Sequence, residues 1–415
     1  MFYHEEQARL LSSTKRFKVV IAGRGSGKTE VAKRYLIMQS LATPRGLFFY
    51  IAPTLQQARN IAWQDFLELI PKEYLKNKSE NTSTIRFTNG AEIRIISGEK
   101  PERVEGVQWD GGVIDECSDQ SLFKLFNLSL GPAMTHKKAW CWLIGIPKRW
   151  GVGAKYFYEA FDQGLSNDPD CPFESFHWHS STVVDPEELD MRRRTLPPAD
   201  FREQYEASRE NTTGLVCPDF GEENIIKVKY DPTRPIIVGS DFNVNPMAWV
   251  LAQYKDKALY FFDELFLRNT TTQKTLDHLY HKYPTHTGGW AFCGDATSNY
   301  RKTSAALTDY VQIDSDPRFL NKKIAYPKKN PAVQDRITVV NAAICNAASQ
   351  RRVFIDPNNC KNLISDLSYL SYDDKGEINK VGDLSHMFDA FGYAVMQFLP
   401  MHLARPVPSV RILTN

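Results

Sequence analysis

This sequence has no long apolar run, few cysteines and almost no net charge. No apolar run reaches the roughly 18 residues that a membrane-spanning helix needs, so we expect no membrane partner. The seven cysteines are scattered and odd in number, which favours reduced residues of an intracellular protein over a disulfide framework. The first residues, MFYHEEQARLL, have neither the charge nor the apolar order of a secretory signal. These absences together predict an intracellular protein.

The charges are nearly balanced, with 51 basic and 49 acidic residues and a net charge of +2. Any surface that binds nucleic acid must therefore be local. The hydrophobic fraction of 42% is that of a globular protein, and we find no internal repeat. A chain of 415 residues is too long for one ordinary core, so two or three domains are expected.

The sequence changes character twice along its length. Residues 1–152 alternate short apolar strands with helices, which favours a mainly parallel sheet. Residues 153–212 are polar with a helical pattern, and we expect a helical lid and linker there. Residues 213–415 return to mixed strands and helices without a second glycine-rich loop. The predicted fold class is therefore α/β, with two domains joined by a small helical segment.

Residues 22–29 read AGRGSGKT, after the apolar strand FKVVIA and before a helical segment. In a phosphate-binding loop, backbone N–H groups surround the β- and γ-phosphates, a lysine neutralises them and a hydroxyl binds Mg²⁺. Lys28 and Thr29 fill the last two roles. Ala22 replaces the usual first glycine, which we expect to be tolerated because the position ends a strand. An ordinary glycine turn is the alternative. The predicted ATP-binding residues of this loop are Gly23, Arg24, Gly25, Ser26, Gly27, Lys28 and Thr29.

Two adjacent acids end the short strand GGVIDE. Asp115 is expected to hold Mg²⁺ together with Thr29, as in P-loop hydrolases, and Glu116 to activate the attacking water. Two acids at a strand tip are common, so this assignment depends on the loop upstream.

Such hydrolases usually need an arginine to stabilise charge in the transition state. Arg24 could act in cis from within the loop, and Arg103, before the acidic strand, could act in trans. Gln7 could contact the edge of the adenine. Each of these three could instead be an ordinary surface residue.

A second set of acids lies far downstream. Asp241 follows the strand IIVGS, Asp295 follows GWAFCG, and Asp383, His386 and Asp389 lie on or before the last helix. Converging carboxylates repel one another unless cations intervene, and Mg²⁺ or Mn²⁺ suits a site of oxygen ligands. Two such ions about 3.5–4 Å apart can cleave a phosphodiester by in-line displacement. The set predicts a metal-dependent nuclease site, unless each acid is merely a strand end or helix cap.

Basic residues lie on two loops of the same half. YPKKNPAVQDR contains Lys328 and Lys329, and NYRKTS contains Arg301 and Lys302. We predict that these loops contact DNA phosphates, and a solvated surface is the alternative.

Five stretches in this order resemble the large terminase subunit of tailed bacteriophages: AGRGSGKT, GGVIDE, GSDFNVNP, CGDATSN and HMFDAFGYA. The resemblance implies a P-loop (ASCE-type) ATPase domain over 1–152 and an RNase H-like nuclease domain over 213–415. The positions that match the family's functional residues are Arg24, Asp115, Glu116, Asp241, Asp295, Asp389 and His386, with Asp383 as a further candidate ligand.

The resemblance also implies ATP-driven packaging of double-stranded viral DNA into the procapsid, with endonuclease cleavage of the concatemer. The implied partners are the portal protein, a small terminase subunit and other copies of this chain in a ring, in the host cytoplasm. Two other classes stay open. One is a helicase or DNA-repair ATPase whose second half binds nucleic acid, and the other is a structural capsid component with a degenerate ATPase site.

Overall fold

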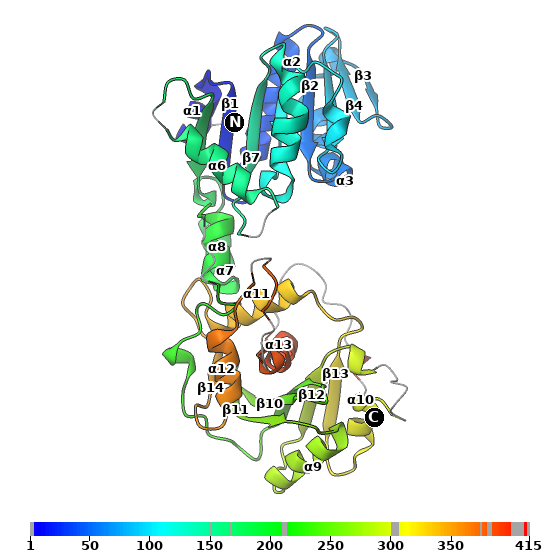
Figure 1. Ribbon diagram of the computed structural model, residues 1–415, viewed down its shortest axis with the longest axis vertical. Helices are drawn as coiled ribbons and strands as arrows, with labels where there is room; N and C mark the ends of the chain where they lie inside the picture. The colour runs from blue at the N-terminus through cyan, green and yellow to red at the C-terminus, as the bar shows by residue number, and fades with distance from the viewer. Residues whose placement is uncertain are drawn as a thin grey trace. The chain divides into compact units, whose positions relative to one another are not determined.

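The computed structural model describes residues 4–149, 152–166, 168–209, 214–299, 307–373, 376–379, 384–399 and 411–412. The chain divides into two compact units, Met1–Leu189 with Ala199–Asn211, and Asp190–Pro198 with Thr212–Asn415. Each unit is built on one sheet with helices against it (Figure 1). The predicted α/β class is confirmed.

The first unit contains an eight-stranded sheet in the order β3-β4-β5-β2-β6-β7-β1-β8. From β5 to β8 all neighbours are parallel, and β4 and β3 add an antiparallel edge. One strand, β7, separates β1 from β6. The strands are β1 (Phe17–Ala22), β2 (Leu47–Ala52), β3 (Leu75–Ser79), β4 (Thr84–Phe87), β5 (Glu92–Ser97), β6 (Gly111–Ile114), β7 (Trp140–Gly145) and β8 (Phe173–Trp178).

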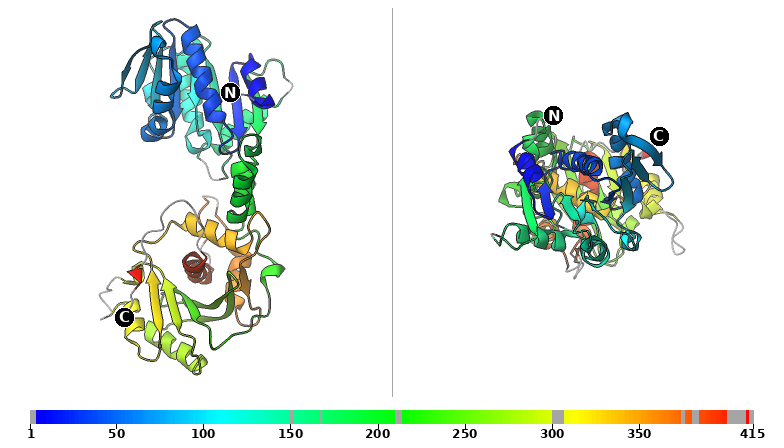
Figure 2. Two further views of the ribbon diagram at one scale, coloured as in Figure 1. Left: turned by 180° about the vertical axis from the view of Figure 1, so that it is seen from behind. Right: turned by 90° about the horizontal axis from the view of Figure 1, so that it is seen from above.

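Apolar side chains of the central strands alternate between two cores. On β1, Val20 and Ala22 belong to one core, and Val19 and Ile21 to the other. Continuous apolar strands of this kind are typical of a parallel sheet that is covered on both faces. One core includes residues of α1 (Glu5–Ser12), α2 (Lys28–Ala42), α3 (Leu55–Ala58) and α4 (Gln64–Leu69). The other includes α5 (Gly131–Thr135) and α6 (Ala154–Gly164). The blue helix α2 lies along the strands in Figure 2 (left).

The second unit contains a seven-stranded sheet in the order β14-β11-β10-β9-β12-β13-β15. β9, β10 and β11 form an antiparallel meander, and β12 and β13 continue the sheet parallel to β9. The strands are β9 (Ile236–Asp241), β10 (Met247–Lys255), β11 (Ala258–Leu267), β12 (Trp290–Gly294), β13 (Lys322–Tyr326), β14 (Val353–Ile355) and β15 (Arg411–Ile412).

This sheet is also covered on both faces. One core joins the strands to α11 (Val333–Ile344), α12 (Lys361–Tyr369) and α13 (His386–Phe398). The other joins them to α9 (Thr272–Lys282) and α10 (Asp309–Ser315). Helix α13 packs directly on β9 and β10, and Figure 1 shows it end-on beside these strands. Its first turn therefore lies near the carboxyl end of β9.

The segment 153–212 differs from the helical lid and linker that the sequence analysis predicted. It contains α6, α7 (Pro186–Thr195) and α8 (Pro198–Tyr205), but also the strand β8, which pairs with β1 along its whole length. The sequence of β8 (FESFHW) was not recognised as a strand, because an edge strand needs only a partly apolar pattern and several of its side chains are polar.

Candidate active sites

The glycine-rich loop connects β1 to α2 at the carboxyl edge of the parallel sheet. Gly25 and Gly27 have φ of +71° and +81°, and Gly27 precedes the first residue of α2 without a side-chain cap. Only glycine adopts such angles without strain. The backbone N–H groups at the start of α2 are thus presented to an anion, as phosphate sites require. Ala22 is the buried last residue of β1, which explains why the usual first glycine is dispensable here.

The interior of the loop holds an unmatched polar group. The Oγ of Ser26 is buried without a hydrogen-bond partner in the described part of the chain. The carbonyl oxygen of Ser26 accepts from Trp178 Nε1 at 3.1 Å and from Gln7 Nε2 at 3.4 Å. Buried hydroxyls normally have a partner, so the loop fits a ligand with further acceptor atoms, such as a phosphate.

Asp115 and Glu116 follow β6 directly, as predicted. Asp115 is 1% exposed, and its Oδ2 accepts from Thr29 Oγ1 at 2.9 Å and from Tyr50 Oη at 2.7 Å. The structure therefore joins the loop hydroxyl to the strand acid across 86 positions of sequence. Burial and the neighbouring Asp115 raise the pKa of Glu116, and Lys28 opposes that rise. Glu116 also has a φ of +52°, which turns it out of the strand direction.

The remaining candidates of this site lie in different surroundings. Gln7 is buried beneath the loop, close enough that a Cβ at Gly27 would lie 2.9 Å from its Nε2. Arg24 is exposed, and its backbone N–H donates to the Gln204 carbonyl at 2.6 Å. Arg103 is exposed on a short 3₁₀ turn after β5, at the same edge of the sheet. The adenine contact of Gln7 and the choice between the two arginines stay predictions.

The second group of acids gathers at one pocket of about 450 Å³. Asp241 ends β9, and Asp295 follows β12, the parallel neighbour of β9. His386 and Asp389 lie in the first turn of α13. All four line this pocket. Asp383 lies outside the described residues, as do Arg301 and Lys302.

The acids of this pocket are held by protein donors. Asp241 Oδ2 accepts from Asn243 Nδ2 at 2.7 Å and lies 2.9 Å from His386 Nδ1. The hydrogen bond to Asp241 raises the pKa of His386. Asp295 accepts from the hydroxyls of Thr297 and Ser298.

Asp389 Oδ1 lies 2.5 Å from Arg336 Nη2. No three His, Cys, Asp or Glu residues of the described ranges lie close enough together to hold one ion. The donor set, three carboxylates and an imidazole on one pocket, is nevertheless that of a site for a hard divalent cation.

Asp366 of α12 fixes the helix that carries His386 and Asp389. Its Oδ2 accepts the backbone N–H groups of Ser385, Met387 and Phe388 at 3.0–3.1 Å. Burial raises the pKa of Asp366 to about 6, although these three bonds oppose the rise. The sequence analysis missed Asp366, Arg336 and Tyr50. Only Asn243 carried a local signal, because it lies in the motif GSDFNVNP.

The loop with Lys328 and Lys329 adjoins the pocket. Asn330, next in sequence, accepts the backbone N–H of Ala296 at 2.6 Å, and both lysines are exposed. This places two cations beside the strand end that carries Asp295.

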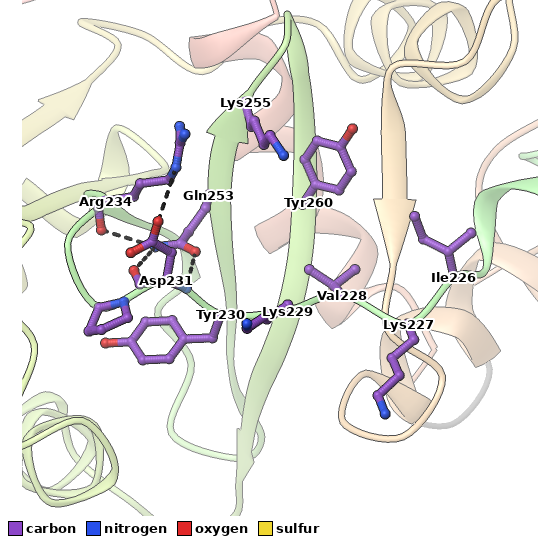
Figure 3. A pocket seen from close by; sticks show the side chains of 11 residues that line it. Ile226, Lys227, Val228, Lys229, Tyr230, Asp231, Arg234, Gln253, Lys255 and Tyr260 are labelled. Carbon is purple, nitrogen blue, oxygen red and sulfur yellow. Dashed lines mark hydrogen bonds and ion pairs between the residues drawn. The ribbon is translucent and has the colours of Figure 1, made fainter.

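Another cavity, of about 480 Å³, opens toward the beginning of β9 and the end of β10 (Figure 3). Lys227, Lys229 and Lys255 line it, and Figure 3 shows Asp231, which also lines it, paired with Arg234. Its one carboxylate is therefore already paired. This cavity has the larger volume, but only the pocket at the carboxyl ends of β9 and β12 has the acids that a cation needs.

Comparisons with known proteins agree with this arrangement. Residues 19–149 match the family model of the terminase large subunit, T4likevirus-type, N-terminal. Over 290 residues the chain is 25% identical to the large terminase subunits of Thermus virus P23-45 and Thermus phage G20c, covering 58% of this chain and 58% of each relative. It thus spans little more than half the length of the curated relatives it matches.

The fold is that of a solved large terminase. The large terminase of the thermophilic bacteriophage D6E superposes with a TM-score of 0.56 at 14% identity, covering 96% of this chain and all of that one. The predicted fold class, α/β with two sheets in succession along the chain, is confirmed.

Proposed function

We propose that this chain, which resembles the large terminase subunits of tailed phages, is an ATP-driven motor that packages double-stranded viral DNA and cuts it with a metal-dependent nuclease. The observation that carries the proposal is the hydrogen bond between Thr29 and Asp115, 2.9 Å long. It joins the phosphate loop to the acid of a neighbouring strand, which is the arrangement that holds Mg-nucleotide in P-loop hydrolases.

In the first site, the loop N–H groups and Lys28 would bind the β- and γ-phosphates. Thr29 and Asp115 would hold Mg²⁺, which neutralises charge on the phosphates when bound. Glu116 would accept a proton from the attacking water, and its raised pKa suits a general base more than that of an exposed glutamate does. Structures of the D6E large terminase with ADP and with ATP-gamma-S have the same fold, with a TM-score of 0.54 each.

In the second site, Asp241, Asp295 and Asp389 would hold Mg²⁺ or Mn²⁺, with His386 and Asp383 as further candidates. Bound cations would polarise the scissile phosphate and lower the pKa of an attacking water. The chain's own contribution is to place the three carboxylates at adjacent strand ends and on one helix end. Lys328 and Lys329 would bind the DNA backbone.

The partners follow from the resemblance. We propose double-stranded DNA as substrate, and a ring of copies of this chain that acts with the portal protein and a small terminase subunit at the procapsid, in the host cytoplasm. Among the helices that the structure describes, none is long and apolar enough to cross a membrane.

The test uses the full chain and two single variants. Wild type should hydrolyse ATP and, with Mn²⁺, linearise or nick a supercoiled plasmid. Lys28→Ala should lose only the first activity and Asp295→Ala only the second. ATP turnover without any metal-dependent nicking would favour the helicase or repair ATPase instead. Absence of ATP turnover in a folded, metal-supplied wild type would favour a structural capsid component.

A further inference from the structure

Arg336 contacts Asp389, one of the acids of the carboxylate pocket, from a helix that carries none of the predicted ligands. It lies in the first turns of α11, and the whole residue is 5% exposed. Its Nη2 lies 2.5 Å from Asp389 Oδ1. The two residues are 53 positions apart in the sequence, so the contact is made by the packing of α11 on α13.

Helix α13 is shaped to receive this side chain. Asp389, Gly392 and Tyr393 are spaced by three and four positions and share one face. A Cβ at Gly392 would lie 2.7 Å from Cδ of Arg336, so only glycine leaves room for the arginine stem. The guanidinium carbon lies 4.8 Å above the ring centre of Tyr393, where a cation is attracted by an aromatic face. These contacts hold the guanidinium in one position.

The ion pair is largely withdrawn from water. The side chains of Arg336 and Asp389 are 7% and 20% exposed. Removing one partner of a buried pair leaves the other charge uncompensated. The Nε of Arg336 is also buried without a partner within the described ranges, which is a cost in a folded protein. The arginine is thus placed to suit the carboxylate rather than its own hydrogen bonding.

We propose that Arg336 is a positioning residue of the nuclease site, which holds the Asp389 carboxylate in one orientation so that a divalent cation meets a preformed ligand. The inference rests on the proposed nuclease function. Arg336 acts through Asp389 and contacts neither the cation nor the DNA. Groups that hold a metal ligand in this way typically contribute about 10–100-fold to metal affinity.

An arginine that competed with the cation would affect metal affinity in the opposite direction. A guanidinium that merely occupied Asp389 in place of a cation would compete with it, and its positive charge would repel the metal. Removing such an arginine would tighten metal binding, whereas removing a positioning arginine weakens it.

The experiment titrates Mn²⁺ into the full-length protein by calorimetry. Arg336→Met keeps much of the stem, and we expect Mn²⁺ affinity to fall about 10–100-fold. Arg336→Lys keeps the charge but lacks the planar fork. Its Mn²⁺ affinity should lie between those of wild type and Arg336→Met. Arg318→Met is the matched control. Arg318 pairs with Asp316 at 2.6 Å and with Asp277 at 2.8 Å in the same unit. Neither of these carboxylates lines the pocket, so the Arg318 variant should bind Mn²⁺ like wild type.

Unchanged or tighter Mn²⁺ binding by Arg336→Met, with its melting temperature near that of wild type, overturns the inference. If Arg336→Met does not fold, Arg336→Lys decides, because wild-type affinity in that variant would mean that the fork geometry has no role. Failure of wild type itself to bind Mn²⁺ would reject the proposed metal site rather than the role of Arg336.

Discussion

Glu116→Gln should separate ATP hydrolysis from ATP binding. Glu116 follows the buried Asp115 at the end of β6, and burial together with Asp115 raises its pKa. A raised pKa means that the ionised glutamate is unfavourable in the folded chain relative to the unfolded one. Near neutral pH, an uncharged glutamine removes that cost, so the melting temperature should not fall.

The expected loss of rate in Glu116→Gln follows from the proposed role of Glu116 as a general base. A positioned general base contributes about 10²–10⁴-fold in rate, or about 2.7–5.4 kcal/mol of transition-state stabilisation. Nucleotide affinity should change far less, because the hydrogen bonds of Asp115 to Thr29 and Tyr50 do not involve the Glu116 side chain. Loss of one negative charge near the phosphates should, if anything, tighten ATP binding.

The assay is phosphate release under saturating Mg-ATP, with binding of a fluorescent ATP analogue measured on the same preparations. Lys28→Ala is the contrasting variant and should weaken analogue binding itself. Asp119→Asn is the matched control, since Asp119 also acts on Glu116 electrostatically but pairs with Lys148. It should turn over ATP close to wild type. Turnover by Glu116→Gln within tenfold of wild type would refute the assignment of the base.

Three further variants test the second unit. Asp295→Ala should abolish Mn²⁺-dependent plasmid nicking while phosphate release stays at the wild-type rate. Lys328→Ala combined with Lys329→Ala should reduce the slope of log K against log salt for duplex DNA by about 0.9 per lost phosphate contact. Asp366→Ala leaves three backbone N–H groups at the start of α13 without their acceptor, and should lower the free energy of unfolding by about 1–3 kcal/mol and the melting temperature by roughly 2–12 °C.

Each of these has a control in the same unit. Lys227→Ala with Lys229→Ala removes the same charge from the cavity of Figure 3, and an equal change of salt slope in both double variants would remove the case for DNA at the carboxylate pocket. Asp366→Asn keeps an acceptor oxygen and should lose less stability than the alanine variant. Parallel loss of nicking and ATP turnover in a folded Asp295→Ala protein would contradict two separate sites.

Local chemistry decided which elements could be predicted. The loop after β1 was recognisable because Gly25 and Gly27 need positive φ. The strand β8 was missed because it lies at the edge of the sheet. Its partly polar sequence has no period that separates it from a helix or loop, and only pairing with β1 makes it a strand.

The same distinction applies to the sites. Asp241 and Asp295 could be placed together because parallel strands end at one edge, and the structure puts both on one pocket. Arg336 and Asp366 could not be placed, because each acts on α13 from another helix, and nothing in the residues around them indicates that partner. The contact of Asp389 with Arg336 was likewise indicated by no sequence pattern.

The two proposed sites have the same arrangement of a strand end and a helix N-terminus, but the charge at the helix end differs. In each unit, a strand end of a parallel pair lies beside the N-terminus of a helix, α2 in the first and α13 in the second. At α2 no side chain caps the helix, so its N–H groups and positive dipole end stay available to phosphate. At α13 the N–H groups of Ser385, Met387 and Phe388 are all taken by Asp366, which adds a negative charge to the first turn. A helix end that is filled by a carboxylate no longer attracts an anion, and with Asp389 on its first turn it favours cations instead. In this chain, the helix end of the proposed phosphate site keeps its N–H groups uncapped, and that of the proposed metal site is capped by Asp366.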